Sequence, residues 1–265
     1  MADEAWSAEI TTCCATVYGY PWVTWLLGEF WHPGGAALTD EMGYGLELTA
    51  HDLLVDVAAG QGSSACRWAE RFGCRVRGIE YGDQQVAAAR SKVSMAGLDA
   101  RVTVQRADAE RLPLLDATVD AIACECSLCL FPDPGAVLRE WRRVLRSTGR
   151  VGVADIFRTG PLPEGLDELA AWVSCLGGAR SPRGYEHLLA LAGFEVVTYQ
   201  DHRAALTAMV EQIAARVTAW SPLLVRARPG ASWDIRRIKQ VQEALLKAIE
   251  DGRLGYGLWI ARFAS

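Results

Sequence analysis

Short apolar runs alternate with helical patterns from residue 52 to residue 155, and this alternation constrains the fold more than any other feature of the chain. The runs are 53–58, 75–82, 102–106, 119–126 and 150–157. Each pair of runs is joined by a segment that can form a right-handed crossover, as in a parallel sheet with helices on its faces. The sequence therefore predicts an α/β fold.

The patterns beyond residue 160 add elements to this sheet. They predict helices over 166–179, 182–194, 203–220 and 233–251, a sixth strand over 195–200 and a last strand over 255–263. The two long helices precede the last strand, so we expect them to form an inserted helical cap. We divide the chain into a helical and aromatic N-terminal segment (1–50) covering the site, a ligand-binding region (51–160) and a C-terminal cap region (161–265) that completes the sheet.

Charge and composition exclude several classes of partner. The 265 residues carry a formal net charge of −5 and no block of Lys or Arg, so we expect no nucleic-acid partner. The apolar stretch 10–28 contains Gly19 and Pro21, and it fits neither a signal peptide nor a membrane span. We therefore expect a cytoplasmic protein that takes a small-molecule substrate; the sequence leaves monomer and dimer open.

A glycine turn follows the first predicted strand. Asp56 ends that strand, and Ala58, Gly60 and Gly62 follow it. Glycines at such a turn allow the backbone N–H groups to face a ligand. Taken alone, the same pattern also fits an ordinary connection between a strand and a helix.

Acidic residues end the next two strands. Glu80, with Tyr81 beside it, lies at about the twenty-residue spacing from the glycine turn at which a carboxylate binds both ribose hydroxyls. Asp108 and Ala109 end the third strand, where an adenine amino group could be recognised. All of these lie at the carboxyl ends of strands, the edge at which open α/β sheets bind ligands.

This order of motifs, with "REWRRVLRSTGRVGVAD" behind it, resembles the class I S-adenosylmethionine-dependent methyltransferases over about residues 52–155. The resemblance implies a Rossmann-like sheet and an S-adenosylmethionine site formed by the residues above and by Glu125. One departure is Ala58, which replaces the first glycine of the usual D/E-x-G-x-G-x-G loop. A dinucleotide dehydrogenase would carry G-x-G-x-x-G, which residues 58–63 do not supply.

Three of the eight cysteines lie together at the end of the fourth strand, in "ACECSLCLF". If the strand continues, Cys124 and Cys126 share one of its faces. A zinc site is disfavoured because Cys126 and Cys129 have no second pair spaced to match, and a redox C-x-x-C is expected at an early helix start. We expect Cys124 to be packed in the core. Buried packing is also expected for Cys66 and Cys74.

A closer resemblance accounts for these thiols. "ECSLCLFPD" followed by "CLGGA" and "LLALAGFEV" resembles the arsenite methyltransferases. The resemblance implies that Cys126 and Cys175, with Cys13 or Cys14, bind trivalent arsenic as the substrate. It also implies an external thiol reductant and a role in arsenic detoxification. Soft thiolates suit this soft metalloid.

The sequence departs from the arsenite methyltransferases at two positions near the thiols. Glu125 and Cys129 stand where the family has Asn. Cys124 and Cys129 could each be a further ligand or a packing residue, and we favour packing for Cys124.

Two other functions stay open. The acceptor could be a small organic thiol, amine or hydroxyl, or the chain could be a non-catalytic thiol sensor for a metalloid or zinc. The aromatic residues Trp22, Trp25, Phe30 and Trp31 either cover the sulfonium or pack on the domain.

Overall fold

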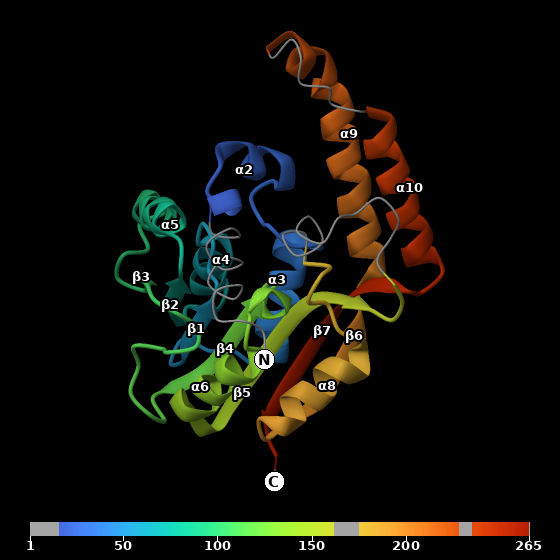
Figure 1. The fold of residues 1–265 in the computed structure, drawn as a ribbon. Coiled ribbons are helices and arrows are strands. Elements are labelled where there is room, and N and C mark those ends of the chain that lie inside the picture. The colour runs from blue at the N-terminus through green and yellow to red at the C-terminus, as the bar shows by residue number, and fades with distance from the viewer. Residues whose placement is uncertain (1–15, 162–174, 228–234, 265) are drawn as a thin grey trace.

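The computed structural model describes residues 16–161, 175–227 and 235–264. Its centre is a seven-stranded sheet in the order β3-β2-β1-β4-β5-β7-β6 (Figure 1). The strands are β1 (Leu53–Val57), β2 (Arg75–Glu80), β3 (Val102–Arg106), β4 (Val119–Glu125), β5 (Leu145–Arg158), β6 (Phe194–Asp201) and β7 (Leu254–Phe263). The pairs among β1 to β5 are parallel, and β7 runs antiparallel between β5 and β6. The predicted α/β class with a Rossmann-like sheet is confirmed.

Helices cover both faces of the sheet. They are α2 (Pro21–Leu27), α3 (Gly35–Gly45), α4 (Ser63–Phe72), α5 (Asp83–Met95), α6 (Pro134–Val144), α8 (Pro182–Leu191), α9 (Arg203–Ala227) and α10 (Ile235–Glu250), with a short 3-10 helix at Leu128–Leu130. Buried side chains of α3, α4 and α5 form one apolar core with the sheet, and those of α6 and α8 form a second core on the other face. The sheet is therefore covered on both sides, as parallel sheets require.

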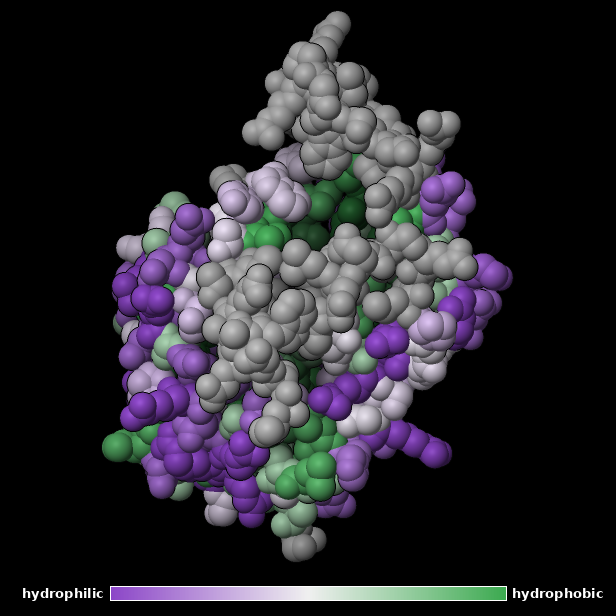
Figure 2. Space-filling view, viewed as in Figure 1, coloured by the Kyte–Doolittle hydropathy of each residue, from purple (hydrophilic) through white to green (hydrophobic). Residues whose placement is uncertain are grey.

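The cap lies where the sequence predicted it. Helices α9 and α10 connect β6 to β7 and stand side by side beyond one end of the sheet (Figure 1). Arg216 of α9 donates hydrogen bonds to the carbonyl oxygens of Trp25 and Leu26 in α2. The cap is thereby joined to the N-terminal helices, and Figure 2 shows hydrophobic side chains set back from the surface between them.

Two predicted helices end differently in the structure. The helical pattern that precedes the predicted strand at 150–157 forms a helix only as far as Val144, because Leu145 is extended and pairs with Val119 of β4. The helix expected over 166–179 does not include Cys175–Ala179, where Cys175 has a left-handed backbone (φ 64°). Residues 166–174 lie outside the described ranges. Among the helices that are described, none is long and apolar enough to cross a membrane.

Candidate functional site

A cavity opens at the carboxyl ends of β1, β2 and β4. Its walls come from three segments far apart in the sequence: the glycine turn, the N-terminal stretch before α3, and the loop after β4. The lining side chains include Glu29, Phe30, Trp31, His32, Asp56, Ala58, Gly60, Glu80, Tyr81, Glu125, Cys126 and Phe131. The cavity thus lies at the edge of the sheet where the sequence predicted a ligand.

The glycine turn and Glu80 form one end of this cavity. Ala58, Gly60 and Gly62 all have positive φ angles of 60°, 52° and 75°. Glu80 accepts hydrogen bonds from the backbone N–H groups of Gly60 and Gly82, each at 2.9 Å. Burial raises the pKa of Glu80, and these two N–H groups oppose that shift. The carboxylate therefore fixes the turn and still faces the cavity.

Asp56 presents an unsatisfied oxygen at the cavity wall. Its side chain is 3% exposed, and its Oδ2 has no hydrogen-bond partner among the described residues. Burial, together with the charges of Glu125 and Glu80, raises the pKa of Asp56 well above its ordinary value. A cationic group of a ligand would satisfy this oxygen and lower the cost of its burial.

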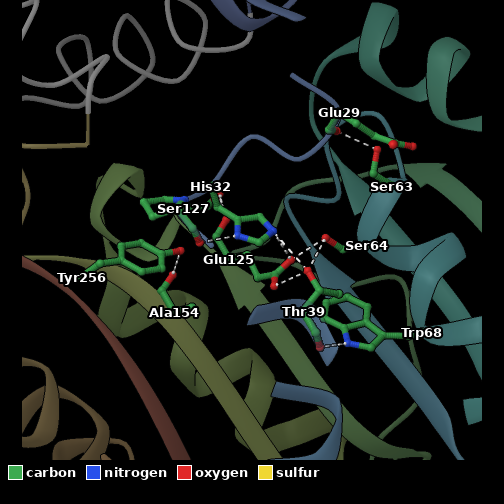
Figure 3. Close-up of polar contacts among 11 residues, drawn as sticks. Glu29, His32, Thr39, Ser63, Ser64, Trp68, Glu125, Ser127, Ala154 and Tyr256 are labelled. Carbon is green, nitrogen blue, oxygen red and sulfur yellow. Dashed lines mark hydrogen bonds and ion pairs between the residues drawn. The ribbon is translucent and has the colours of Figure 1, made fainter. Parts of the chain in front are cut away.

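A buried polar network, which we did not predict from the sequence, contributes to the cavity lining (Figure 3). His32 Nε2 lies 3.2 Å from Glu125 Oε2, and both side chains are 5% exposed. Thr39 of α3 and Ser64 of α4 donate hydroxyl hydrogen bonds to the same carboxylate. Glu125, at the end of β4, therefore holds residues from three other segments together.

The thiols of Cys126 and Cys175 meet beside this network. Cys126 Sγ donates to Cys175 Sγ at 3.6 Å, and in its protonated form Cys175 donates to the Cys126 carbonyl oxygen at 3.3 Å. Hydrogen bonds from Cys126 and Cys129 hold the pKa of Cys175 well below its ordinary value. The cluster can therefore keep one thiolate in a buried place, and Cys126 itself lines the cavity.

Cys129 and Asp155 lie behind the pair. The backbone N–H of Cys129 donates to Asp155 Oδ2 at 2.9 Å. Burial and the negative charge of Cys175 raise the pKa of Asp155 to about 7. Within the described ranges, no three His, Cys, Asp or Glu side chains gather as ligands for a metal ion.

The remaining cysteines separate from this cluster. The expected shared face of Cys124 and Cys126 is wrong, because β4 ends at Glu125 and Cys126 has a left-handed φ of 54°. Cys124 instead packs in the opposite core, fully buried, which confirms its predicted packing role. Cys66 and Cys74 are buried in the first core as expected. Cys13 and Cys14 lie outside the described residues.

Asp108 and Ala109 lie away from the cavity walls formed by the described residues. Asp108 is exposed and its Oδ1 accepts the backbone N–H of Glu110, while Ala109 is buried in the core beneath. Their predicted adenine-binding role stays a prediction.

The part of the chain that forms the first strands and helices of the sheet is similar to known proteins. Residues 55–153 match the family described as a methyltransferase domain. The chain is 32% identical to Methyltransferase GfsG of Streptomyces halstedii over 170 residues, which cover 63% of this chain and 61% of that protein. This stretch of the chain is therefore similar to methyltransferase domains. Solved methyltransferase structures share its fold, including geranyl diphosphate methyltransferase in complex with SAM (TM-score 0.69, 22% identity, 86% of this chain and 85% of that one).

Other similarities show how widely this methyltransferase fold is used. A 27-O-demethylrifamycin SV methyltransferase of Amycolatopsis mediterranei is 38% identical over 140 residues, covering 53% of this chain and 51% of that protein. An arsenite methyltransferase of Halobacterium salinarum is 26% identical over 149 residues, covering 55% of this chain and 38% of that protein. The [4+2]-cyclase SpnF shares the fold over 97% of this chain and 96% of its own (TM-score 0.77, 23% identity). The chain spans about half to three fifths of the first two relatives, and the fold alone does not fix its reaction.

The residues that line the cavity fit S-adenosylmethionine. The unsatisfied Asp56 oxygen suits the cationic methionine end. A Cβ at Gly60 would lie 3.3 Å from the Trp31 ring, so the ring lies close against this turn. Glu80 faces the same cavity from the second strand, and its ribose contact stays a prediction.

Proposed function

We propose that this methyltransferase transfers the methyl group of S-adenosylmethionine to a trivalent arsenical, arsenite or methylarsenite, bound by Cys126 and Cys175. The observation that carries the proposal is the 3.6 Å contact between these thiols, which are 49 residues apart in the sequence. A third ligand from Cys13 or Cys14 belongs to the same proposal. Cys129 is close enough to the pair to influence its protons.

The chain's own residues would bind and orient the cofactor. Glu80 would accept the ribose hydroxyls, Asp56 the methionine ammonium, and the turn at Gly60 would face the ligand with its backbone. When bound, S-adenosylmethionine supplies an electrophilic methyl group. The protein's part is then alignment and exclusion of water, since an in-line displacement needs little covalent help.

The thiol pair suits a soft acceptor. Thiolates select soft, thiophilic centres, and two of them leave the lone pair of trivalent arsenic free for the methyl carbon. Cys126 lines the cavity and Cys175 is 2% exposed behind it, so a bound arsenical would lie at the cavity wall. The arsenite methyltransferase among the relatives agrees with this acceptor.

The proposal is tested by turnover with cysteine variants. Purified protein is incubated with S-adenosylmethionine, arsenite and glutathione, and S-adenosylhomocysteine formation is followed. We expect Cys126→Ser and Cys175→Ser each to lose activity by at least about a hundredfold, on the order of 3 kcal/mol of barrier. Cys74→Ser is the matched control, because Cys74 is buried away from the cavity and a hydroxyl can keep its hydrogen bond to the Trp68 carbonyl. Full activity in the Cys126 and Cys175 variants would refute the acceptor site.

A small organic hydroxyl is the second candidate acceptor. The relatives with higher identity include the 27-O-demethylrifamycin SV methyltransferase, and aromatic residues such as Phe30, Trp31 and Phe131 give the cavity apolar walls. This alternative predicts turnover with hydroxylated aromatic or macrocyclic compounds that is unaffected by Cys126→Ser. The same variants therefore decide between the two acceptors.

A further inference from the structure

The wall opposite the glycine turn is a short stretch of chain, residues 29–32, held by contacts at both ends. At the outer end, Lys92 of α5 pairs with Glu29 at 3.1 Å, and Ser63 donates to the Glu29 carbonyl oxygen at 2.8 Å. At the inner end the stretch reaches His32. Between them, the Trp31 ring lies against the turn at Gly60.

The two ends differ in exposure. The Glu29 side chain is 65% exposed, so its ion pair with Lys92 is worth little. The His32 and Glu125 side chains are each 5% exposed, and removing one partner of a buried pair leaves the other charge uncompensated. The inner contact therefore fixes the wall more strongly than the outer one.

Both ring nitrogens of His32 face acceptors. Nδ1 lies 3.0 Å from the Pro33 carbonyl oxygen, while Nε2 lies 3.2 Å from Glu125 Oε2 and 3.2 Å from Thr39 Oγ1. The Thr39 hydroxyl donates its own hydrogen bond to Glu125 Oε1, so towards His32 it can only accept. An imidazolium that donates from both nitrogens satisfies every one of these contacts, and it leaves no free nitrogen to act as a base.

We infer that His32 is a positioning residue for cofactor binding: through its buried pair with Glu125 it holds Trp31 and the cavity wall in place against the glycine turn. The inference rests on the proposed function, because it takes this cavity as the S-adenosylmethionine site. Glu125 is the last residue of β4, so the position of the wall is tied directly to the sheet. Thr39 and Ser64 complete the anchor from α3 and α4.

The test is a double-mutant cycle on ligand affinity. The dissociation constant of S-adenosylhomocysteine is measured by calorimetry for wild type, His32→Gln, Glu125→Gln and the double variant. We expect each single change to weaken binding about tenfold and the double change to add no more than about threefold, because both break one contact. In turnover, KM for S-adenosylmethionine should rise about tenfold while kcat stays within about threefold.

His202→Gln is the matched control. His202 also lies beside a carboxylate, 3.4 Å from Glu41, but it is not among the described residues that line the cavity. Its variant should bind S-adenosylhomocysteine like wild type. Thr39→Val, which keeps the shape of the side chain and removes the bridging hydroxyl, should weaken binding about threefold and provides a test if His32→Gln does not fold.

The outcomes separate the two proposals. Unchanged affinity in His32→Gln and Thr39→Val, or losses that add fully in the double variant, would overturn the positioning role and leave the proposed function standing. Absence of S-adenosylhomocysteine binding by the wild type itself would instead overturn the cofactor site on which both depend.

Discussion

Replacing Ala58 by glycine should stabilise the protein. Ala58 occupies the position of the first glycine of the usual methyltransferase loop, and its φ of 60° lies in the left-handed region. That conformation costs a residue with a side chain about 1–2 kcal/mol, whereas glycine adopts it freely and loses about 0.5–1 kcal/mol through its greater freedom in the unfolded chain. The net expectation for Ala58→Gly is a gain of about 0.5–1 kcal/mol.

Urea unfolding followed by tryptophan fluorescence measures this change directly. For a chain of 265 residues the corresponding rise in Tm is about 1–2 °C. Gly62→Ala is the opposite test at the same turn. Gly62 has a φ of 75°, and a Cβ added there would lie 3.1 Å from Ala89 Cβ. The substitution should therefore lower the unfolding free energy by about 1–3 kcal/mol. The reasoning is refuted if Ala58→Gly unfolds at lower urea than wild type.

Three further predictions concern stability. Burial alone would lower the pKa of His32, but the charge and hydrogen bond of Glu125 raise it. The excess unfolding free energy of wild type over His32→Gln should therefore be largest below about pH 6 and should fall as the pH rises through the raised pKa. Unfolding free energies measured at about pH 6 and 9 check this, and a difference that stays constant would contradict it. Trp68→Phe should lower the unfolding free energy, measured by chemical denaturation, by about 1–2 kcal/mol more than Trp259→Phe does. The reason is that Trp68 Nε1 donates a hydrogen bond to the Thr39 carbonyl oxygen at 2.8 Å, whereas Trp259 Nε1 has no partner among the described residues. Ser181→Ala should lower the unfolding free energy by about 1 kcal/mol, since Ser181 caps α8 by accepting the Gly184 N–H, and an unchanged urea midpoint would argue against that cap.

The sheet and one end of the cavity could be predicted because local patterns encode them. Buried parallel strands read as apolar runs, and the glycine turn with Glu80 twenty residues after Gly60 is a spacing that the fold imposes. The meeting of Cys126 and Cys175 was predicted from resemblance alone. Both cysteines lie outside helices and strands and have positive φ angles, so neither sequence periodicity nor spacing predicts that their thiols meet.

There is a physical reason why the buried network of His32 and Glu125 could not be predicted from the sequence. His32 pairs with Glu125 only after the N-terminal stretch crosses the end of β4, and no local pattern links the two positions. One signal was present: His32 stands immediately before the turn Pro33-Gly34 that begins α3, where a buried polar side chain needs a partner. The early end of α6 likewise followed from strand pairing by Leu145, which competes with helix propensity.

In the proposed function, methyl groups pass from S-adenosylmethionine to arsenic held by Cys126 and Cys175. The most direct measurement uses S-adenosylmethionine with a deuterated methyl group, arsenite and glutathione, and determines the mass of the arsenic products by chromatography and mass spectrometry. We expect trideuteromethyl arsenicals from wild type and Cys74→Ser, and none from Cys126→Ser or Cys175→Ser. If wild-type protein that binds S-adenosylhomocysteine forms no methylated arsenic, the proposed function is contradicted.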